Sequence, residues 1–239
     1  MSMTDATLRA EYGAAVERMA GRALAALRGG EGAGAWSWPL SRAELAAVRV
    51  LGADLFAPHL TGALPWDDAP ADAVAEACRI FPPRPEDDPV TAWHDWAARA
   101  LAARTGTAVA GPTAGAPPEP PPPARTPAPE ADGWHQLAAA AARLAPMALP
   151  AFDSPLHRTV RAHPLAVARG TVRAMLRRDY RTAARLTRWL AWLHHTRTPV
   201  ALEIAPLLTR LKQVGGDSAR TALDLAVAEH LVQAHPEGR

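Results

Sequence analysis

A proline-rich segment runs through the middle of this 239-residue chain and separates two stretches of similar length. It covers residues 107–133 and contains the run PPEPPPPARTPAPE. Because proline has no backbone N–H and its ring fixes φ, such a run neither joins a sheet nor continues a helix. It is typical of an extended polyproline II spacer, although a PxxP ligand within residues 118–123 is an alternative. We therefore predict two domains, residues 1–106 and 134–239, joined by a linker over 107–133.

The two flanking stretches have the composition of helical proteins. Hydrophobic residues make up 49% of the chain, which is enough to build a folded core. Alanine, leucine and arginine dominate, and all three favour helices. β-branched residues are sparse, and no stretch alternates apolar and polar side chains as a half-buried strand would. We expect an all-α fold of short amphipathic helix pairs, arranged as a bundle or as an α-solenoid.

Capping residues and prolines place four helices in the N-terminal stretch. Ser41 followed by Glu44 is a capping box, and Asp88 before Pro89 joins a cap to a proline at the first helical position. The first helix has an apolar stripe that begins at Leu8. The expected helices cover residues 5–28, 42–55, 70–81 and 89–105.

Five further helices are expected after the linker, over residues 134–144, 165–176, 180–195, 199–214 and 218–234. Asp179 and Asp217 are placed to cap two of them. Four prolines between residues 146 and 164 predict an irregular segment there, and Pro206 predicts a kink inside its helix.

The helix expected over 165–176 has an apolar stripe as well. Its members are spaced for one side of a helix, and we predict that this side faces the core: Leu165, Ala168, Val172, Met175 and Leu176.

The stretch from 149 to 232 resembles the HEAT-like helical-repeat region of large bacterial proteins of actinobacterial type. The residues behind this resemblance are LPAFDSPLHRTVRAHPLAVARG and HHTRTPVALEIAPLLTRL. The resemblance covers about a third of the chain, and no exact internal repeat period accompanies it. It implies a scaffold or binding surface and brings no catalytic residues with it.

Positive charge is concentrated in the C-terminal stretch. Residues 1–110 hold 10 basic and 14 acidic residues, whereas residues 134–239 hold 15 basic and 7 acidic ones. Between residues 157 and 197 there are ten arginines and a single acidic residue, Asp179. We predict that the arginines form a basic binding face on one helix or on a helical hairpin, made of Arg169, Arg173, Arg177, Arg181, Arg185 and Arg188.

Three environments would accommodate so many like charges. Phosphate backbones are one, since arginine binds phosphate with two hydrogen bonds. The acidic N-terminal stretch, or another acidic protein surface, is the second. The third is plain solvation of a charged helix face. Against nucleic acid, the chain has no Gly-rich loop, zinc-finger spacing or clear helix-turn-helix pattern.

Residue patterns for catalysis or metal binding are weak. The one cysteine, Cys78, lies on an inward helix stripe, and no HExxH, GxSxG or P-loop motif occurs. Arginine followed by histidine five to seven residues later is similar to the pattern of helical ribonucleases of the HEPN type, at Arg158 with His163 and at Arg188 with His194 or His195. Chance placement predicts about as many such pairs. We predict no catalytic residue, metal or cofactor.

Tryptophan supplies eight of the aromatic residues, and several lie outside the expected helix stripes. Tryptophan is enriched among residues that anchor a partner, although a tryptophan in a loop more often covers a helix end or packs under the loop. We take Trp36, Trp38 and Trp134 as possible apolar anchors.

These observations lead to one functional hypothesis. The chain is expected to be a cytoplasmic, non-enzymatic scaffold or adaptor that binds an acidic partner through the arginine face. Nucleic-acid binding by the same face is the alternative, and a helical ribonuclease is third. No apolar run approaches the ~20 residues that span a bilayer, so stable membrane insertion is not expected. The sequence leaves the oligomeric state open.

Overall fold

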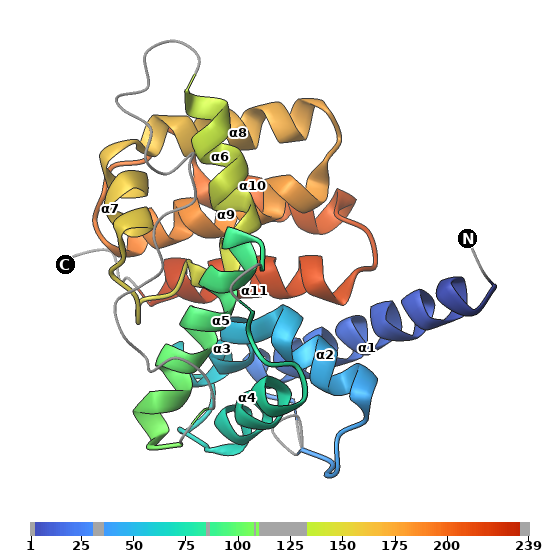
Figure 1. The fold of residues 1–239 in the computed structure, drawn as a ribbon. Helices are drawn as coiled ribbons and strands as arrows, with labels where there is room; N and C mark the ends of the chain where they lie inside the picture. Colours follow the sequence, from blue (N-terminus) through green and yellow to red (C-terminus); the bar gives the residue numbers. More distant parts are fainter. Residues whose placement is uncertain (1–2, 31–35, 85–86, 108, 110–132, 235–239) are drawn as a thin grey trace. The chain divides into compact units, whose positions relative to one another are not determined.

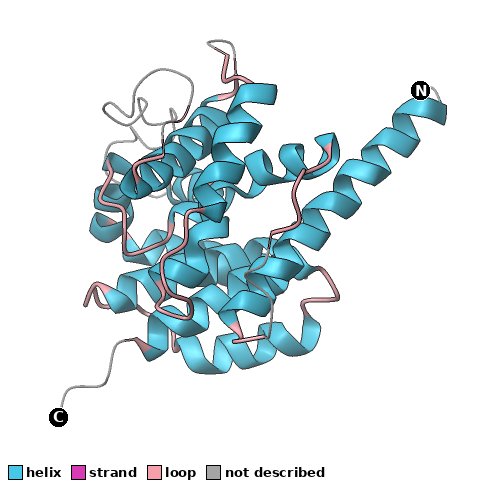
Figure 2. Ribbon diagram, turned by 90° about the horizontal axis from the view of Figure 1, so that it is seen from below, coloured by secondary structure: helices cyan, strands magenta, loops and turns pink. Residues whose placement is uncertain are grey.

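The computed structural model describes residues 3–30, 36–84, 87–107, 109 and 133–234. The proline run of the predicted linker, including the PxxP segment 118–123, lies outside the described residues. Every regular element in the described ranges is an α-helix or a 3-10 helix, so the all-α prediction is confirmed (Figure 2). The chain divides into two compact units, which we call unit 1 (residues 1–118) and unit 2 (residues 119–239).

Unit 1 is built from the four predicted helices and some shorter turns of helix (Figure 1). The predicted caps are confirmed: Ser41 and Glu44 form a capping box, and the Asp88 carboxylate accepts a hydrogen bond from the Val90 N–H. The elements are α1 (Met3–Leu27), α2 (Arg42–Leu51), η1 (Gly52–Phe56), α3 (Ala57–Leu60), α4 (Ala69–Ile80), α5 (Pro89–Ala102) and η2 (Ala103–Thr105).

The core of unit 1 holds an ion pair beside its apolar side chains. Asp95 is almost fully buried on α5 and receives two hydrogen bonds from the Arg49 guanidinium, at 3.0 and 2.7 Å. Cys78 is buried close by, and burial raises the pKa of its thiol, as expected for an unreactive cysteine. Leu8 was predicted to face inward, but it is half exposed, because the buried side of α1 starts only at Ala15.

Unit 2 contains the five predicted helices and one that was not predicted. The unpredicted helix is α7 (Pro155–Ala162), which follows Ser154 as its cap within the segment expected to be irregular. The others are α6 (Trp134–Arg143), α8 (Pro164–Leu176), α9 (Tyr180–His195), α10 (Ile204–Val214) and α11 (Ala219–Gln233), with a 3-10 turn, η4 (Ala145–Met147), between α6 and α7.

Two local predictions in unit 2 were wrong. Pro206 does not kink a helix, because α10 begins at Ile204 and the proline lies in its first turn. There its missing N–H has no helical partner to lose. The cap of α11 is Ser218, whose hydroxyl accepts from the Thr221 N–H, and not the neighbouring Asp217.

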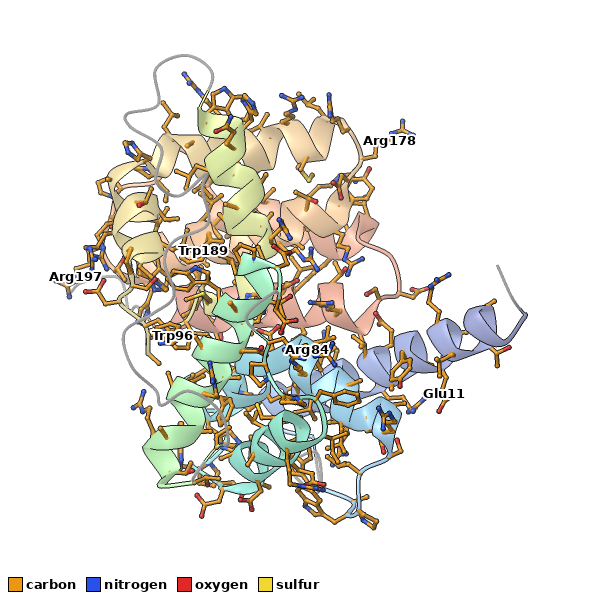
Figure 3. The ribbon with its side chains drawn as sticks, in the orientation of Figure 1. Glu11, Arg84, Trp96, Arg178, Trp189 and Arg197 are labelled. Atoms are coloured by element: carbon orange, nitrogen blue, oxygen red, sulfur yellow. The ribbon has the colours of Figure 1, made fainter. Side chains whose placement is uncertain are left out.

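Helix α9 lies at the centre of unit 2. It packs against α6, α8, α10 and α11, and its residues from Leu186 to Leu193 are all buried. Figure 3 shows Trp189 in the interior of this bundle, where its indole N–H donates to the Ala141 carbonyl at 2.7 Å. The unit is therefore organised around one enclosed helix.

Arg188 lies in the middle of α9 and is also fully buried. Its guanidinium donates to Asp224 of α11 at 3.2 Å and to the Pro146 and Ala148 carbonyls at 3.2 and 3.4 Å. The side chain thus joins α9, α11 and the η4 segment through charge-assisted hydrogen bonds.

Replacing Arg188 by methionine is expected to lower the free energy of unfolding of unit 2 by about 3–5 kcal/mol, because it leaves a buried carboxylate and buried carbonyls without their donor. Hydrogen exchange of the α9 amides measures this change in the full chain. Arg181→Met is the matched control on the exposed first turn of α9, where we expect a change within about 0.5 kcal/mol. Equal effects of the two variants would contradict the prediction.

Candidate functional site

The structure separates the six predicted face arginines by depth. Four are exposed: Arg169 and Arg173 on α8, Arg177 directly after it, and Arg181 on the first turn of α9. The break between the helices falls at residues 177–179, so the run occupies two packed helices and not one.

Two arginines of the predicted face belong to the interior. Arg185 is largely buried, with its Nε 3.9 Å from the Asp224 carboxylate, and Arg188 is enclosed as described above. The sequence hypothesis was therefore wrong in giving Arg188 to a surface, and Arg185 lies at the boundary. Arg185 and Arg188 follow Arg181 along one side of α9. Helix α11 covers that side of α9 after the first turn of α9.

The large side chains Leu165, Val172 and Leu176 of the predicted α8 stripe face the opposite way from the prediction, whereas Ala168 is buried as predicted and Met175 is half-buried. Leu165, Val172 and Leu176 are exposed by 50%, 43% and 80%, although we expected them in the core. The buried side of α8 consists mainly of small residues, with Gly170 and Ala174 among them, because α6 approaches closely there. A Cβ atom on Gly170 would lie 2.4 Å from the Ala138 Cβ of α6.

Apolar and basic side chains consequently share the outer side of α8. At 100° per residue, an arc of about 100° holds five exposed side chains, which we call the α8 face: Leu165, Arg169, Val172, Arg173 and Leu176. Neither Arg169 nor Arg173 forms an ion pair with any residue in the described ranges, and the same holds for Arg177 and Arg181 beyond the end of the face. Helix α8 itself contains no acidic residue.

A further exposed arginine occupies the turn between α8 and α9. Arg178 has a φ of 58°, in the left-handed region where glycine is favoured, and Figure 3 shows its side chain directed away from the bundle. The Asp179 N–H bonds to the Ala174 carbonyl at 2.9 Å, which closes the end of α8. This turn adds a positive charge next to Arg177.

Trp134 lies beside one of the α8 arginines. It begins α6, and the Arg173 guanidinium lies 5.8 Å from the centre of its ring, in a cation–π arrangement. The two residues line a groove of about 270 Å³ between α6, α8 and α9. The structure thus brings together a predicted apolar anchor and predicted arginines that lie 39 or more residues apart in the sequence.

The other two predicted anchors belong to unit 1. The Trp36 and Trp38 rings stack with their centres 6.4 Å apart, and the Arg22 guanidinium lies 5.0 Å from the Trp36 ring centre. Trp38 is half exposed, whereas Trp36 covers a cavity of about 30 Å³ beside α1. A space of that size holds about one water molecule, so Trp36 has a packing role there.

A serine and a histidine meet in the interior of unit 2 without forming an accessible site. His157 is fully buried against the rings of Trp189 and Trp192. Its Nε2–H donates to the Met147 carbonyl at 2.8 Å, and its Nδ1 accepts from the Ser154 hydroxyl at 2.8 Å. Both ring nitrogens are therefore satisfied by the fold, and this serine–histidine pair has no access to a substrate.

The arginine–histidine pairs that are similar to the ribonuclease pattern do not form an accessible site with the groove either. Arg188 is enclosed in the core, so it cannot contact a substrate together with His194 or His195. Arg158 and His163 stay near the surface, and neither lines the groove described above.

In comparisons with known proteins, no family model, no curated protein and no solved structure matches this chain. Among the described residues, no group of three His, Cys, Asp or Glu side chains is arranged to hold a metal ion. No helix in those same ranges has the length and apolar character needed to cross a membrane.

Gly170→Ala is expected to destabilise unit 2 by roughly 1–3 kcal/mol, because the new methyl group overlaps the Ala138 side chain. Gly13→Ala is the matched control on α1, since among the described residues nothing beyond the adjoining residues and backbone of α1 itself lies within 4 Å of the place its methyl group would take. The change should stabilise that helix by roughly 0.5–1 kcal/mol. Hydrogen exchange of the α8 and α1 amides reports both effects. A stabilised α8 would show that the close contact with α6 does not exist.

Unit 2 is expected to lose stability in mild acid because of His157. Burial lowers the pKa of its imidazole to about 4, against about 6.5 in an unfolded chain. Between these values only the unfolded state binds the proton, so stability falls as the pH drops, by about 3 kcal/mol between pH 7 and pH 4. Hydrogen exchange of the α9 amides measures the loss, and an NMR titration of the His157 ring in which the pKa lies near 6.5 would contradict it.

Proposed function

We propose that this protein is a non-enzymatic interaction scaffold or adaptor, and that unit 2 binds an acidic protein partner through the α8 face and the neighbouring Arg177 and Arg181. The observation that carries the proposal is the alternation, along one side of α8, of exposed leucine and valine with arginines that form no ion pair among the described residues. Burying three large aliphatic side chains gives a partner hydrophobic contact, and the arginines add charge complementarity.

The same observation favours a protein over nucleic acid. A phosphate backbone is neutralised by arginine alone and gains nothing from leucine or valine. An amphipathic helix with acidic residues beside its apolar stripe complements both components of the α8 face. Electrostatic attraction would also increase the rate of association.

Two wider predictions belong to this proposal. Unit 2 would be a HEAT-like repeat unit, which is supported by the successive packed pairs α8–α9 and α10–α11 with short connections. The cytoplasm would be its compartment, which is consistent with a single, buried, free cysteine.

Fluorescence anisotropy with two labelled probes tests the proposal: a helical peptide of about 18 residues with leucine on one side and glutamate beside it, and mixed-sequence DNA or RNA. We expect the peptide to bind with a Kd in the micromolar range. Changing Leu165, Val172 and Leu176 together to serine should weaken peptide binding about tenfold or more, since it removes the hydrophobic contact.

Two arginine variants with the same change in net charge complete the test. Gln at Arg169, Arg173 and Arg177 should also weaken peptide binding about tenfold or more, whereas Gln at the exposed Arg158, Arg197 and Arg210 should leave it nearly unchanged. Three results together would identify nucleic acid as the ligand in place of protein. DNA or RNA would bind with a steep salt dependence, the α8 arginine variant would lose this binding, and the serine variant would retain it. Equal losses of peptide affinity in the two arginine variants would show that binding depends on net charge alone and not on the α8 face.

A further inference from the structure

The groove between α6, α8 and α9 has an apolar floor. It is formed by small side chains on the two crossing helices, chiefly Ala138, Ala139 and Ala174, and by Leu186 of α9. Because Gly170 lets the helices approach each other and the flanking residues are only alanines, a space of about 270 Å³ stays open beside the crossing. That space corresponds to about nine water molecules, which suits a ligand smaller than a typical drug molecule.

One wall of the groove is aromatic. Trp134 is half buried at the start of α6, so one part of its ring is supported by the protein and another part lines the open space. The Arg173 guanidinium lies near the ring and does not form an ion pair with another described residue. A flat or extended apolar group has here a surface on which to pack, next to a cation.

Charge at the groove points to a single negative charge on the ligand. Arg173 and Arg177 both line it, and the acidic residue among the lining side chains is Asp179. One Asp179 oxygen accepts from the Thr182 N–H at 3.1 Å, which holds that carboxylate at the start of α9. Counting arginine and aspartate side chains and leaving out His135, which also lines the groove, two arginines and one aspartate give one net positive charge. A monoanion balances this charge, while the second charge of a dianion would add to the repulsion from Asp179.

We propose that this groove binds a small molecule with an apolar body and one carboxylate. The apolar body lies on the alanine floor against Trp134, and the carboxylate pairs with Arg173 and Arg177. Arginine suits this role because its planar guanidinium can donate two parallel hydrogen bonds to a carboxylate. The site does not depend on the proposed protein partner, and its test uses no partner.

The test is an NMR titration of the ¹⁵N-labelled full chain with two probes, 4-phenylbutyrate and octanoate. The Trp134 indole N–H signal is identified by its absence from the spectrum of Trp134→Phe. We expect this signal to shift saturably with a Kd below about 1 mM, and the neutral amides of the two probes to bind about tenfold more weakly. The absence of a saturable shift, or equal binding of acid and amide, would overturn the proposal.

Matched variants locate the binding to the groove. Arg173→Gln with Arg177→Gln should weaken 4-phenylbutyrate about tenfold, whereas Arg169→Gln with Arg181→Gln, which removes the same charge outside the groove, should change the Kd less than about twofold. Ala139→Met, at an exposed position of the floor, should block binding by filling the space. The spectra themselves show whether each variant is folded. If the two pairs of arginine substitutions weakened 4-phenylbutyrate binding equally, the proposal that the groove is a specific binding site would be refuted.

Discussion

The stability of unit 2 depends on hydrogen bonds to the backbone carbonyls of one buried segment that is only partly helical. Residues 144–149, around η4, are all buried, so their carbonyls have no water to bond with. Arg188 supplies donors to the Pro146 and Ala148 carbonyls, and His157 supplies one to Met147. The burial of an arginine is costly alone, but Asp224 balances its charge from α11. One polar centre therefore holds α7, α9 and α11 around the segment.

Most of the fold could be predicted from the sequence because its signals are local. Ser41, Asp88 and Asp179 are each followed by a helix that they cap, and glycine and proline mark where most helices end. The failures have local causes too. Helix α7 was missed because four nearby prolines suggested an irregular segment, although Ser154 before Pro155 repeats the pattern of a cap followed by proline that located α5 correctly.

The candidate site could be predicted only in part, because depth is a property of packing between distant segments. A four-residue spacing groups Arg169 to Arg185 in the sequence, but only the position of α11 decides that Arg188 is enclosed while Arg181 is exposed. The side of α8 that faces inward was decided in the same way. The hydrophobic pattern favoured Leu165 and Leu176, and the close approach of α6 selected the side with Gly170 instead.

The inward orientation of the Gly170 side of α8 determines which side chains of this helix face the solvent. Where two helices cross over glycine and alanine, the large aliphatic side chains of α8 remain on the outer side, among arginines that lack acidic neighbours on that helix. An apolar stripe by itself would attract a second copy of the chain. Arginines between the apolar residues make such self-association unfavourable, because two α8 faces would place like charges together. In the proposed function, charge is therefore the basis of selectivity: like charges oppose the pairing of two α8 faces, opposite charge favours an acidic partner, and the carboxylate site proposed for the groove uses the same preference.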